Sequence, residues 1–218
     1  MHVSVVVPAY NEAGRVGAVL RTVVSSDRVD EIIVVDDGSE DETAQEARAF
    51  PVSVISLAEN SGKAAALDAG IQHARNDVFM FLDADLVGLR REHVDVLINA
   101  YETRRLDMVV GVFSSGRANT DFSQKMNPTF SGQRMISRAL WERAKAFVEQ
   151  ADASVHEMQF GIEAALSRLA SKEGWRLEYV KLEGVTHVLK EEKRGFVRGV
   201  LARLKMYGNM IKWLVKRF

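Results

Sequence analysis

The sequence predicts an α/β fold: a doubly wound, mostly parallel sheet with helices on both faces. Short apolar, β-branched segments recur through the first 90 residues, and the segments between them carry apolar residues at helical spacing. Strands that alternate with helices form βαβ units, whose right-handed crossovers bring the strands into one parallel sheet.

The first strand is predicted at 3–10, where VSVVVPAY is a continuous β-branched run, typical of a strand buried on both faces. A helix follows at 11–26, because Val16, Val19 and Val23 recur on one side of it. The same alternation continues with a strand at 32–35, a helix at 40–50, a strand at 52–57, a helix at 62–75 and a strand at 77–86.

The second half of the chain is less regular. Residues 114–134 are polar and are predicted to form a long loop, and such loops in compact domains are usually functional or mobile. Around this loop the pattern predicts a helix at 91–104, a strand at 106–113, helices at 137–150 and 161–174, and a strand at 177–182.

The composition is that of an ordinary globular protein, since 47% of the 218 residues are hydrophobic and 27% are charged. The absence of cysteine excludes disulfides and thiolate metal sites, which favours a reducing cytoplasm. The first residues lack the pattern of a secretory signal, and no apolar run approaches the roughly 18 residues that span a bilayer. We therefore expect a cytoplasmic protein with a main domain at 1–189 and an appendage at 190–218.

The appendage is basic, although the whole chain has a net charge of −1. Residues 190–218 hold nine Lys and Arg against two Glu, which leaves 20 basic and 28 acidic residues elsewhere. Apolar residues recur at helical spacing in 197–218 and lysines gather on another side, which predicts a basic amphipathic helix. One interpretation is peripheral contact with the inner face of an anionic membrane. The other is that the apolar side packs on the domain or on a second copy of the chain, as in a homodimer.

No nucleic-acid partner is expected, because the polar loop and the strand ends lack aromatic residues interleaved with basic ones.

Polar residues follow each of the first four predicted strands. They are Tyr10, Asn11 and Glu12, then Asp36, Asp37, Gly38 and Ser39, then Asn60, Gly62 and Lys63, and finally Asp83 and Asp85. The carboxyl ends of parallel strands lie at one edge of the sheet, and ligands bind in the crevice at that edge. We therefore expect these side chains to converge on a ligand.

Asp83 and Asp85 are the strongest candidates for chemistry at this edge. If the strand continues through them, residues two apart point to the same side. Two carboxylates at so short a distance repel each other, and a divalent cation between them relieves the repulsion. Asp-x-Asp is also common turn chemistry. Its position among three other polar strand ends favours a Mg²⁺ or Mn²⁺ site, since these ions prefer oxygen ligands and often bind phosphates as well.

Four segments resemble the signature segments of glycosyltransferase family 2, whose members have the GT-A (Rossmann-like) fold and use nucleoside-diphosphate sugars. They are VSVVVPAYNEAGRVGAVL, EIIVVDDGSEDET, NSGKAAALDAGI and FMFLDADL, in the order and spacing of the family. FSGQRMISRALWE is also similar to a segment of the members that resemble dolichyl-phosphate mannose synthase. The resemblance implies a nucleotide-sugar-binding half at 1–115 and an acceptor half at 116–189, and it weakens beyond about residue 140.

The resemblance implies a pocket for the nucleotide in the first half of the chain. Pro8, Ala9, Tyr10 and Glu12 would line this pocket, and Asp37 would hold the base or the ribose.

The resemblance also implies a metal site. Asp83 and Asp85 would bind the cation, and Asp85 would thereby take part in catalysis. His187 would complete the metal shell, and a simple surface histidine is the alternative. Lys63 would lie near the donor phosphates or just behind the aspartates.

Charge on the departing diphosphate needs cationic partners, and Arg117 and Arg134, in or beside the predicted loop, are candidates. Either could equally be a solvated loop arginine. The base that activates the acceptor is expected to be Glu163, with Glu157 left open, although a glutamate in the first turn of a helix also suits the helix dipole.

The implied reaction is metal-dependent transfer of a sugar from a nucleoside-diphosphate sugar to an acceptor hydroxyl or phosphate, with inversion. If the tail binds a membrane, the acceptor would be a polyprenyl phosphate or a glycolipid. A nucleotidyltransferase is one alternative, although such enzymes usually carry a glycine-rich basic loop where this chain has PAYNEAGR. A non-catalytic nucleotide-sugar-binding protein is the other, and the retained carboxylates disfavour it.

Overall fold

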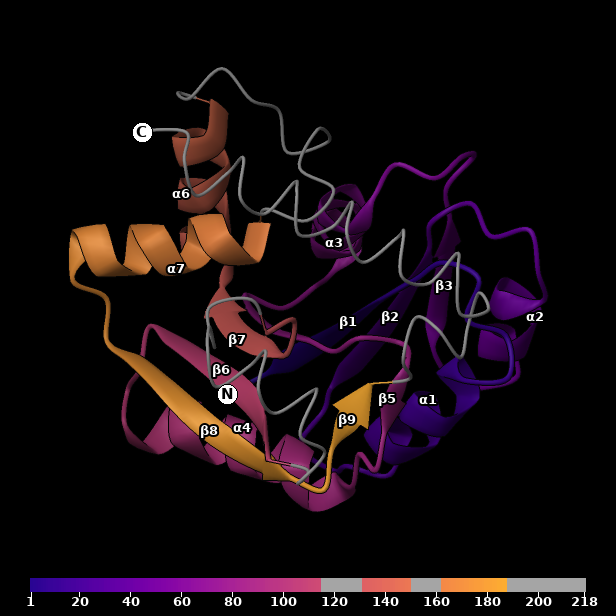
Figure 1. The fold of residues 1–218 in the computed structure, drawn as a ribbon, viewed down its shortest axis with the longest axis horizontal. Helices are drawn as coiled ribbons and strands as arrows, with labels where there is room; N and C mark the ends of the chain where they lie inside the picture. Colours follow the sequence, from indigo (N-terminus) through magenta and orange to yellow (C-terminus); the bar gives the residue numbers. More distant parts are fainter. Residues whose placement is uncertain (115–130, 150–161, 188–218) are drawn as a thin grey trace, which may run out of the picture.

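A computed structural model of the chain describes residues 1–114, 131–149 and 162–187 (Figure 1). The strands are β1 (Val3–Ala9), β2 (Glu31–Asp36), β3 (Ser53–Ser56), β4 (Val78–Phe81), β5 (Leu86–Val87), β6 (Met108–Ser114), β7 (Arg134–Ser137), β8 (Leu177–Glu183) and β9 (Thr186–His187). The helices are α1 (Val16–Val24), α2 (Thr43–Arg48), α3 (Lys63–His73), α4 (Arg91–Thr103), α6 (Arg138–Glu149) and α7 (Ile162–Glu173).

The main sheet has seven strands in the order β3-β2-β1-β4-β7-β6-β8. Neighbouring strands are parallel except at β7, which runs antiparallel to both β4 and β6. The doubly wound, mostly parallel sheet predicted from the sequence is therefore confirmed, and the single reversed strand is an addition to it.

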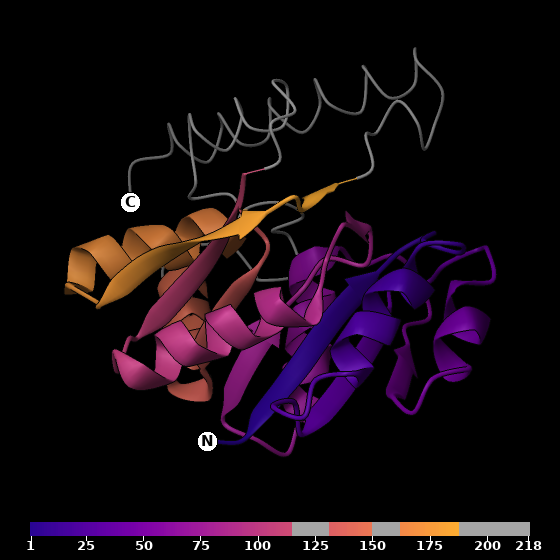
Figure 2. The same cartoon turned by 90° about the horizontal axis from the view of Figure 1, so that it is seen from below.

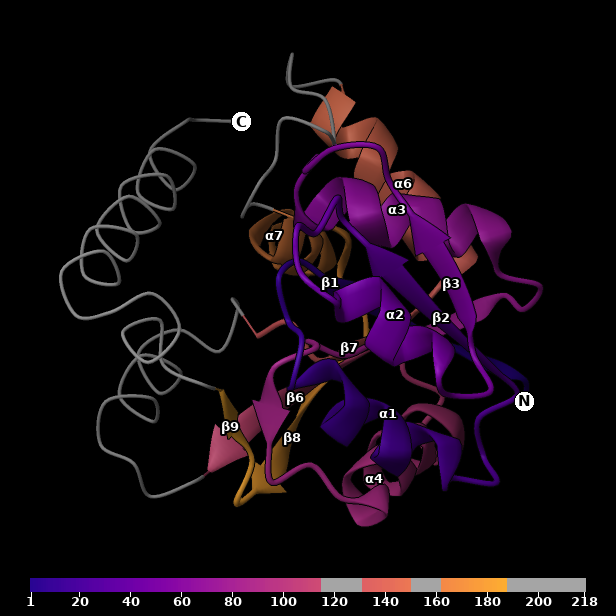
Figure 3. The same ribbon diagram turned by 90° about the vertical axis from the view of Figure 1, so that its right-hand side faces the viewer.

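Two apolar cores lie on opposite faces of this sheet. Helices α3, α6 and α7 supply one core, and helices α1, α2 and α4 supply the other. Figure 3 shows α3, α6 and α7 on one side of the sheet with α1 and α4 on the other, and Figure 2 brings α4, coloured magenta, in front of the strands. In β1 the fully buried Val5 and Val7 face one core and Val6 faces the other, which is why its sequence is an unbroken apolar run.

Strand β7 was not predicted. The predicted loop ended at residue 134 and the predicted helix began at 137, because a four-residue strand that begins with arginine has no recognisable periodicity. Arg134 lies opposite Phe81 of β4 and Val110 of β6, in the middle of the sheet. The predicted loop therefore ends before Arg134.

The fourth strand is shorter than predicted. β4 ends at Phe81, and Asp83 and Asp85 belong to the turn that leads into β5. The expectation that both carboxylates lie on one side of a continuing strand is therefore wrong.

The predicted helix at 197–218 lies outside the described residues. Among the residues that the structure describes, no helix is both long and apolar enough to cross a membrane.

Helix α3 packs very closely on the sheet at Gly70. A Cβ at this position would collide with Cγ1 of Val6 and would lie 3.1 Å from Cγ2 of Val35, both in the fully buried core. Glycine in a helix normally costs about 0.5–1 kcal/mol relative to alanine. Here the missing methyl group sets the helix-to-sheet distance.

We predict that Gly70→Ala destabilises the protein by about 1–3 kcal/mol through overpacking, in spite of the better helix propensity of alanine. Urea unfolding of the purified chain measures this change. The reverse substitution at the preceding residue, Ala69→Gly, should also destabilise, by about 1 kcal/mol from helix propensity plus the loss of a partly buried methyl group that packs against the core. A Gly70→Ala variant more stable than the parent would show that the contact is loose.

Candidate functional site

The candidate site lies at the carboxyl edge of the sheet, beside strand β1. From β1 the chain moves to β2 and β3 on one side, while β4 pairs with the other side of β1. Helices α1 and α2 cover one face and α3 covers the other, so the winding reverses between β1 and β4. Ligands of open α/β sheets bind at such a switch point.

Three potential metal ligands converge next to this point: Asp83, Asp85 and His187. One ligand atom from each lies within 4.8 Å of the others, and this is a group of acidic and imidazole side chains that could hold an ion. His187 Nδ1 is 3.0 Å from Asp85 Oδ1, and His187 Nε2 is 3.6 Å from Asp83 Oδ2. Two carboxylates and an imidazole suit Mn²⁺ and Mg²⁺.

The small sheet formed by β5 and β9 brings His187 to the aspartates (Figure 1). Leu86, the residue after Asp85, is paired with His187. The two chain segments approach so closely that a Cβ on Gly88 would collide with the carbonyl oxygen of Gly184, and both glycines have positive φ angles, 77° and 76°. Backbone pairing of β5 with β9 therefore brings the imidazole of His187 to Asp85.

The histidine ring is fixed from a second side by Phe113 of β6, whose ring centroid lies 4.7 Å away in an edge-on contact. Burial alone would lower the pKa of His187, but the hydrogen bond to Asp85 and the negative charge of Asp83 outweigh it and raise the pKa.

Lys63 lies behind Asp83, between two carboxylates. Its Nζ is 2.6 Å from Asp83 Oδ1 and 2.8 Å from Glu163 Oε1. Burial opposes the charge on Lys63, but the two carboxylates outweigh this effect and raise its pKa. The pKa of Asp83 is lowered, because Lys63 and His187 overcome the desolvation of its carboxylate. Lys63 thus contacts Asp83 directly, and its position near the donor phosphates stays a prediction.

Glu163, the expected base, is held in this network. It lies in the first turn of α7, and only 10% of its side chain is exposed. Its partner Lys63 occupies one carboxylate oxygen, and the structure therefore brings Glu163 to the metal cluster through that lysine.

Arg134, expected in or beside a solvated loop, is instead completely buried in β7. Its Nε donates a hydrogen bond to the carbonyl oxygen of Ser131 at 2.8 Å, and its Nη1 donates one to Ser167 Oγ at 3.0 Å. Burial lowers the pKa of Arg134 to about 10, although the nearby charge of Glu163 opposes this shift. The guanidinium contacts the interior of the protein.

The end of β1 and the loop after it contain four of the predicted nucleotide-lining residues: Pro8 and Ala9 in the strand, and Tyr10 and Glu12 in the loop. Ala9 is buried, and Pro8, Tyr10 and Glu12 are half-buried. The Glu12 side chain forms an ion pair with Arg15.

The backbone N–H groups of this loop already have side-chain partners from the β2–α2 segment. Those of residues 11, 12, 13 and 14 donate to Ser39, Thr43, Asp41 and Glu46 respectively, and Glu46 also accepts from Gly17 at 3.1 Å. Free N–H groups at a helix start often bind phosphate. Here a protein carboxylate occupies the start of α1, and the loop is not a phosphate cradle.

Asp37 fixes the neighbouring loop after β3. Its Oδ1 accepts a hydrogen bond from the Ser61 backbone at 2.8 Å, and its Oδ2 accepts one from the Gly62 backbone at 2.9 Å. Burial is the main effect on this carboxyl and raises its pKa, although both hydrogen bonds act in the opposite direction. Asp37 thereby shapes the edge next to Lys63, the residue that follows Gly62.

Arg117 and Glu157 lie outside the described residues. The sequence analysis missed Gln133, whose Nε2 donates a hydrogen bond to Asp83 Oδ2 at 2.7 Å. Its segment, FSGQR, was noted only as a resemblance. A neutral amide 50 residues from its partner gives no local signal in the sequence.

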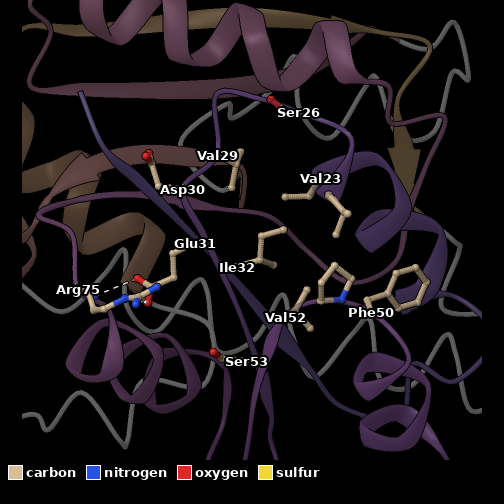
Figure 4. Close-up of a pocket in the computed structure, with 12 residues that line it drawn as sticks. Val23, Ser26, Val29, Asp30, Glu31, Ile32, Phe50, Val52, Ser53 and Arg75 are labelled. Carbon is tan, nitrogen blue, oxygen red and sulfur yellow. Dashed lines mark hydrogen bonds and ion pairs between the residues drawn. The ribbon is translucent and has the colours of Figure 1, made fainter.

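A separate surface hollow lies at the opposite end of the strands (Figure 4). It is lined by residues at the amino ends of β2 and β3, with Val23 and Phe50 on one side and the Glu31–Arg75 ion pair, 3.0 Å, on the other. Glu31 and Arg75 neutralise each other in this hollow, Asp30 adds a further carboxylate, and the metal-ligand group described above lies at the other edge of the sheet.

Comparison with known proteins gives a consistent result. The family model described as "Glycosyl transferase family 2" matches residues 4–159. Over 104 residues the chain is 35% identical to 4,4'-diaponeurosporenoate glycosyltransferase from Staphylococcus aureus (strain USA300), a match that covers 45% of this chain. The same relative from strain NCTC 8325 / PS 47 matches equally well, and the match spans only 28% of the length of these relatives.

The fold resembles that of glucosyl-3-phosphoglycerate synthase from Mycobacterium tuberculosis. A crystal structure of that protein matches with a TM-score of 0.69 and 22% identity, over 97% of this chain and 80% of the other. Its complex with Mn²⁺, UDP and glucosyl-3-phosphoglycerate matches with a TM-score of 0.66 and 24% identity, over 94% and 80% of the two chains.

We predict that Lys63→Met lowers the free energy of unfolding by about 3 kcal/mol, because it leaves two largely buried carboxylates without their cation. The matched control is Lys145→Met. Lys145 pairs with the buried Asp68 at 2.9 Å, but Asp68 also accepts hydrogen bonds from Trp141 and Gln72, so the control should cost less. Denaturant unfolding of both variants measures the difference.

The double variant Lys63→Met/Glu163→Gln should regain part of the loss, since one of the uncompensated charges is removed. If the double variant is less stable than Lys63→Met alone, the ion pair is not the source of the effect.

Proposed function

The chain belongs to glycosyl transferase family 2, and from this premise we propose that it transfers a sugar from a nucleoside-diphosphate donor to an acceptor. The observation that carries the proposal is the convergence of Asp83, Asp85 and His187 at the switch point beside β1. Open α/β sheets bind their ligands at this switch point, and a diphosphate bound there needs positive charge beside it.

A divalent cation, Mn²⁺ or Mg²⁺, would be held by the same three side chains. The donor set fits, because all three ligand atoms lie within 4.8 Å of one another and two of them are carboxylate oxygens. When bound, the cation would neutralise the negative charge that grows on the leaving nucleoside diphosphate. The structurally similar synthase has been crystallised with UDP and either Mn²⁺ or Mg²⁺, which supports this choice of ion.

The residues around the cation site would bind and orient the donor. Lys63 keeps its positive charge behind Asp83 and fixes that carboxylate. Asp37 and the end of β1, Pro8 to Tyr10, would form the pocket for the base and ribose. Because the backbone N–H groups of the β1–α1 loop already have partners, the charge of the diphosphate would be met by the cation site and not by this loop.

We propose a UDP-sugar as the donor. The support is the nucleotide in the complexes of the structurally similar synthase, which has the same fold at 24% identity.

We propose that the catalytic base is an acidic side chain between residues 116 and 189. For Glu163, the ion pair with Lys63 favours a positioning role, because one of its carboxylate oxygens is already occupied by the lysine. Glu157 is then the better candidate for an inverting reaction, on the strength of its sequence position alone. Arg117 is proposed on the same basis to contact the diphosphate, whereas the burial of Arg134 favours a structural role.

The acceptor proposal rests on sequence. The basic segment 190–218 and the similarity of FSGQRMISRALWE to dolichyl-phosphate mannose synthase-like members favour a lipid-linked acceptor at a membrane surface, with contact through 197–218. Packing of that segment on the domain or in a homodimer is the competing proposal.

We predict that UDP raises the melting temperature of the chain by several degrees in Mn²⁺ and much less in EDTA, because a ligand that binds only the folded state stabilises it. Differential scanning fluorimetry with UDP, GDP, CDP and dTDP, each with Mn²⁺ or EDTA, measures both nucleotide preference and metal dependence.

Asp85→Ala should abolish the Mn²⁺-dependent part of this shift. The control is Asp27→Asn, an exposed carboxylate that pairs with Arg91 near the amino end of β2, and it should behave as the parent does. A UDP shift that is equally large in EDTA would contradict metal-dependent binding, and sugar transfer assayed with the preferred nucleotide then separates an enzyme from a binding protein.

A further inference from the structure

We propose that Gln133 is a positioning residue for the metal site: its amide holds the Asp83 carboxylate in the orientation that binds the cation. The proposal rests on the proposed function, because it presumes that Asp83 is a metal ligand. Gln133 lies immediately before β7 and is completely buried.

The two oxygens of Asp83 have different partners. Oδ1 is 2.6 Å from Lys63 Nζ, while Oδ2 accepts a hydrogen bond from Gln133 Nε2 at 2.7 Å. Oδ2 is also the oxygen that faces the rest of the cluster, since it lies 3.6 Å from His187 Nε2. Lys63 therefore covers the far oxygen, and the amide of Gln133 fixes the near one.

The orientation of the amide follows from its surroundings. An ionised carboxylate only accepts hydrogen bonds, so the amide must present its NH₂ group to Asp83. The amide oxygen then lies 3.0 Å from Ser131 Oγ, although the single hydrogen of that hydroxyl has a nearer acceptor in the carbonyl oxygen of Gly111. A flipped amide would place oxygen against oxygen at Asp83, so the carboxylate itself selects the orientation of the amide.

The backbone around Gln133 is fixed just as firmly. The Gly111 N–H donates to the carbonyl oxygen of Gln133 at 2.8 Å, and the Ser131 hydroxyl donates to the carbonyl oxygen of Gly111. Gly132 permits the close approach, because a Cβ there would collide with Lys63 Nζ and lie 2.6 Å from Asp83 Oδ2. The segment 131–133 therefore packs directly against the metal-binding carboxylate.

Loss of the Gln133 hydrogen bond would free Asp83 to turn toward Lys63, its remaining strong partner. Partners of metal ligands typically contribute about 10- to 100-fold to metal affinity. We therefore expect Gln133→Met, which keeps the length of the side chain and removes the amide, to weaken Mn²⁺ binding by about 10- to 100-fold.

The test is calorimetric titration of the full chain with Mn²⁺ alone, in parallel with the melting temperature of the metal-free protein. The matched control is Gln72→Met. Gln72 donates to the Asp68 carboxylate at the same distance, 2.7 Å, but Asp68 belongs to the α3–α6 contact and not to the metal cluster. Gln72→Met should leave the Kd for Mn²⁺ unchanged, whatever its effect on stability.

A Gln133→Met protein that folds and binds Mn²⁺ as tightly as the parent would overturn the proposal. If Gln133→Met does not fold, Gln133→Asn decides, because the shorter amide no longer reaches Asp83: a weaker Mn²⁺ affinity supports the role of Gln133, and an unchanged affinity refutes it. If the parent itself binds no Mn²⁺, the proposed metal site fails and the role of Gln133 fails with it, a result distinct from a selective loss in the variant.

Discussion

The site depends on one buried ammonium group, that of Lys63, placed between the carboxylates of Asp83 and Glu163. Removing three charges from water is costly, and the arrangement persists because each charge has an opposite neighbour at hydrogen-bond distance. The three residues come from the start of α3, the turn after β4 and the first turn of α7. The ion pairs therefore connect the first half of the chain to α7 in its second half, directly beside the candidate metal site.

In the β1–α1 loop, side chains of the protein bind the backbone N–H groups that could otherwise bind an anion. In many nucleotide-binding α/β proteins the first helix start supplies bare N–H groups to phosphate. In this chain Glu46 already occupies that helix start, and Ser39, Asp41 and Thr43 satisfy the preceding N–H groups. The N–H groups of this loop therefore have partners within the protein, and under the proposed function a cation at Asp83, Asp85 and His187 would supply the positive charge.

Much of this was readable from the sequence, and the gaps have physical reasons. Long apolar runs such as that of β1 revealed the strands, and polar residues at their ends revealed Asp83 and Asp85. The predicted continuation of β4 through the two aspartates was wrong, and the position of His187 beside them depends on backbone pairing between residues about 100 positions apart. Arg134 was placed in the wrong environment and Gln133 was not predicted, because important contacts of both are with residues distant along the chain. The sequence around a polar side chain does not show whether that side chain will be buried against a partner.

The reversed strand β7 has a consequence for how the protein assembles on the ribosome. Strands β1 to β4 can pair with one another as soon as they emerge, but Val78 of β4 must wait for Ser137, its partner in β7. Until then β4 and β6 both present unpaired backbone edges, each a template for mispairing with another nascent chain. Completion of the sheet and delivery of Gln133 to Asp83 are thus a single late event, so a truncated chain would lack both.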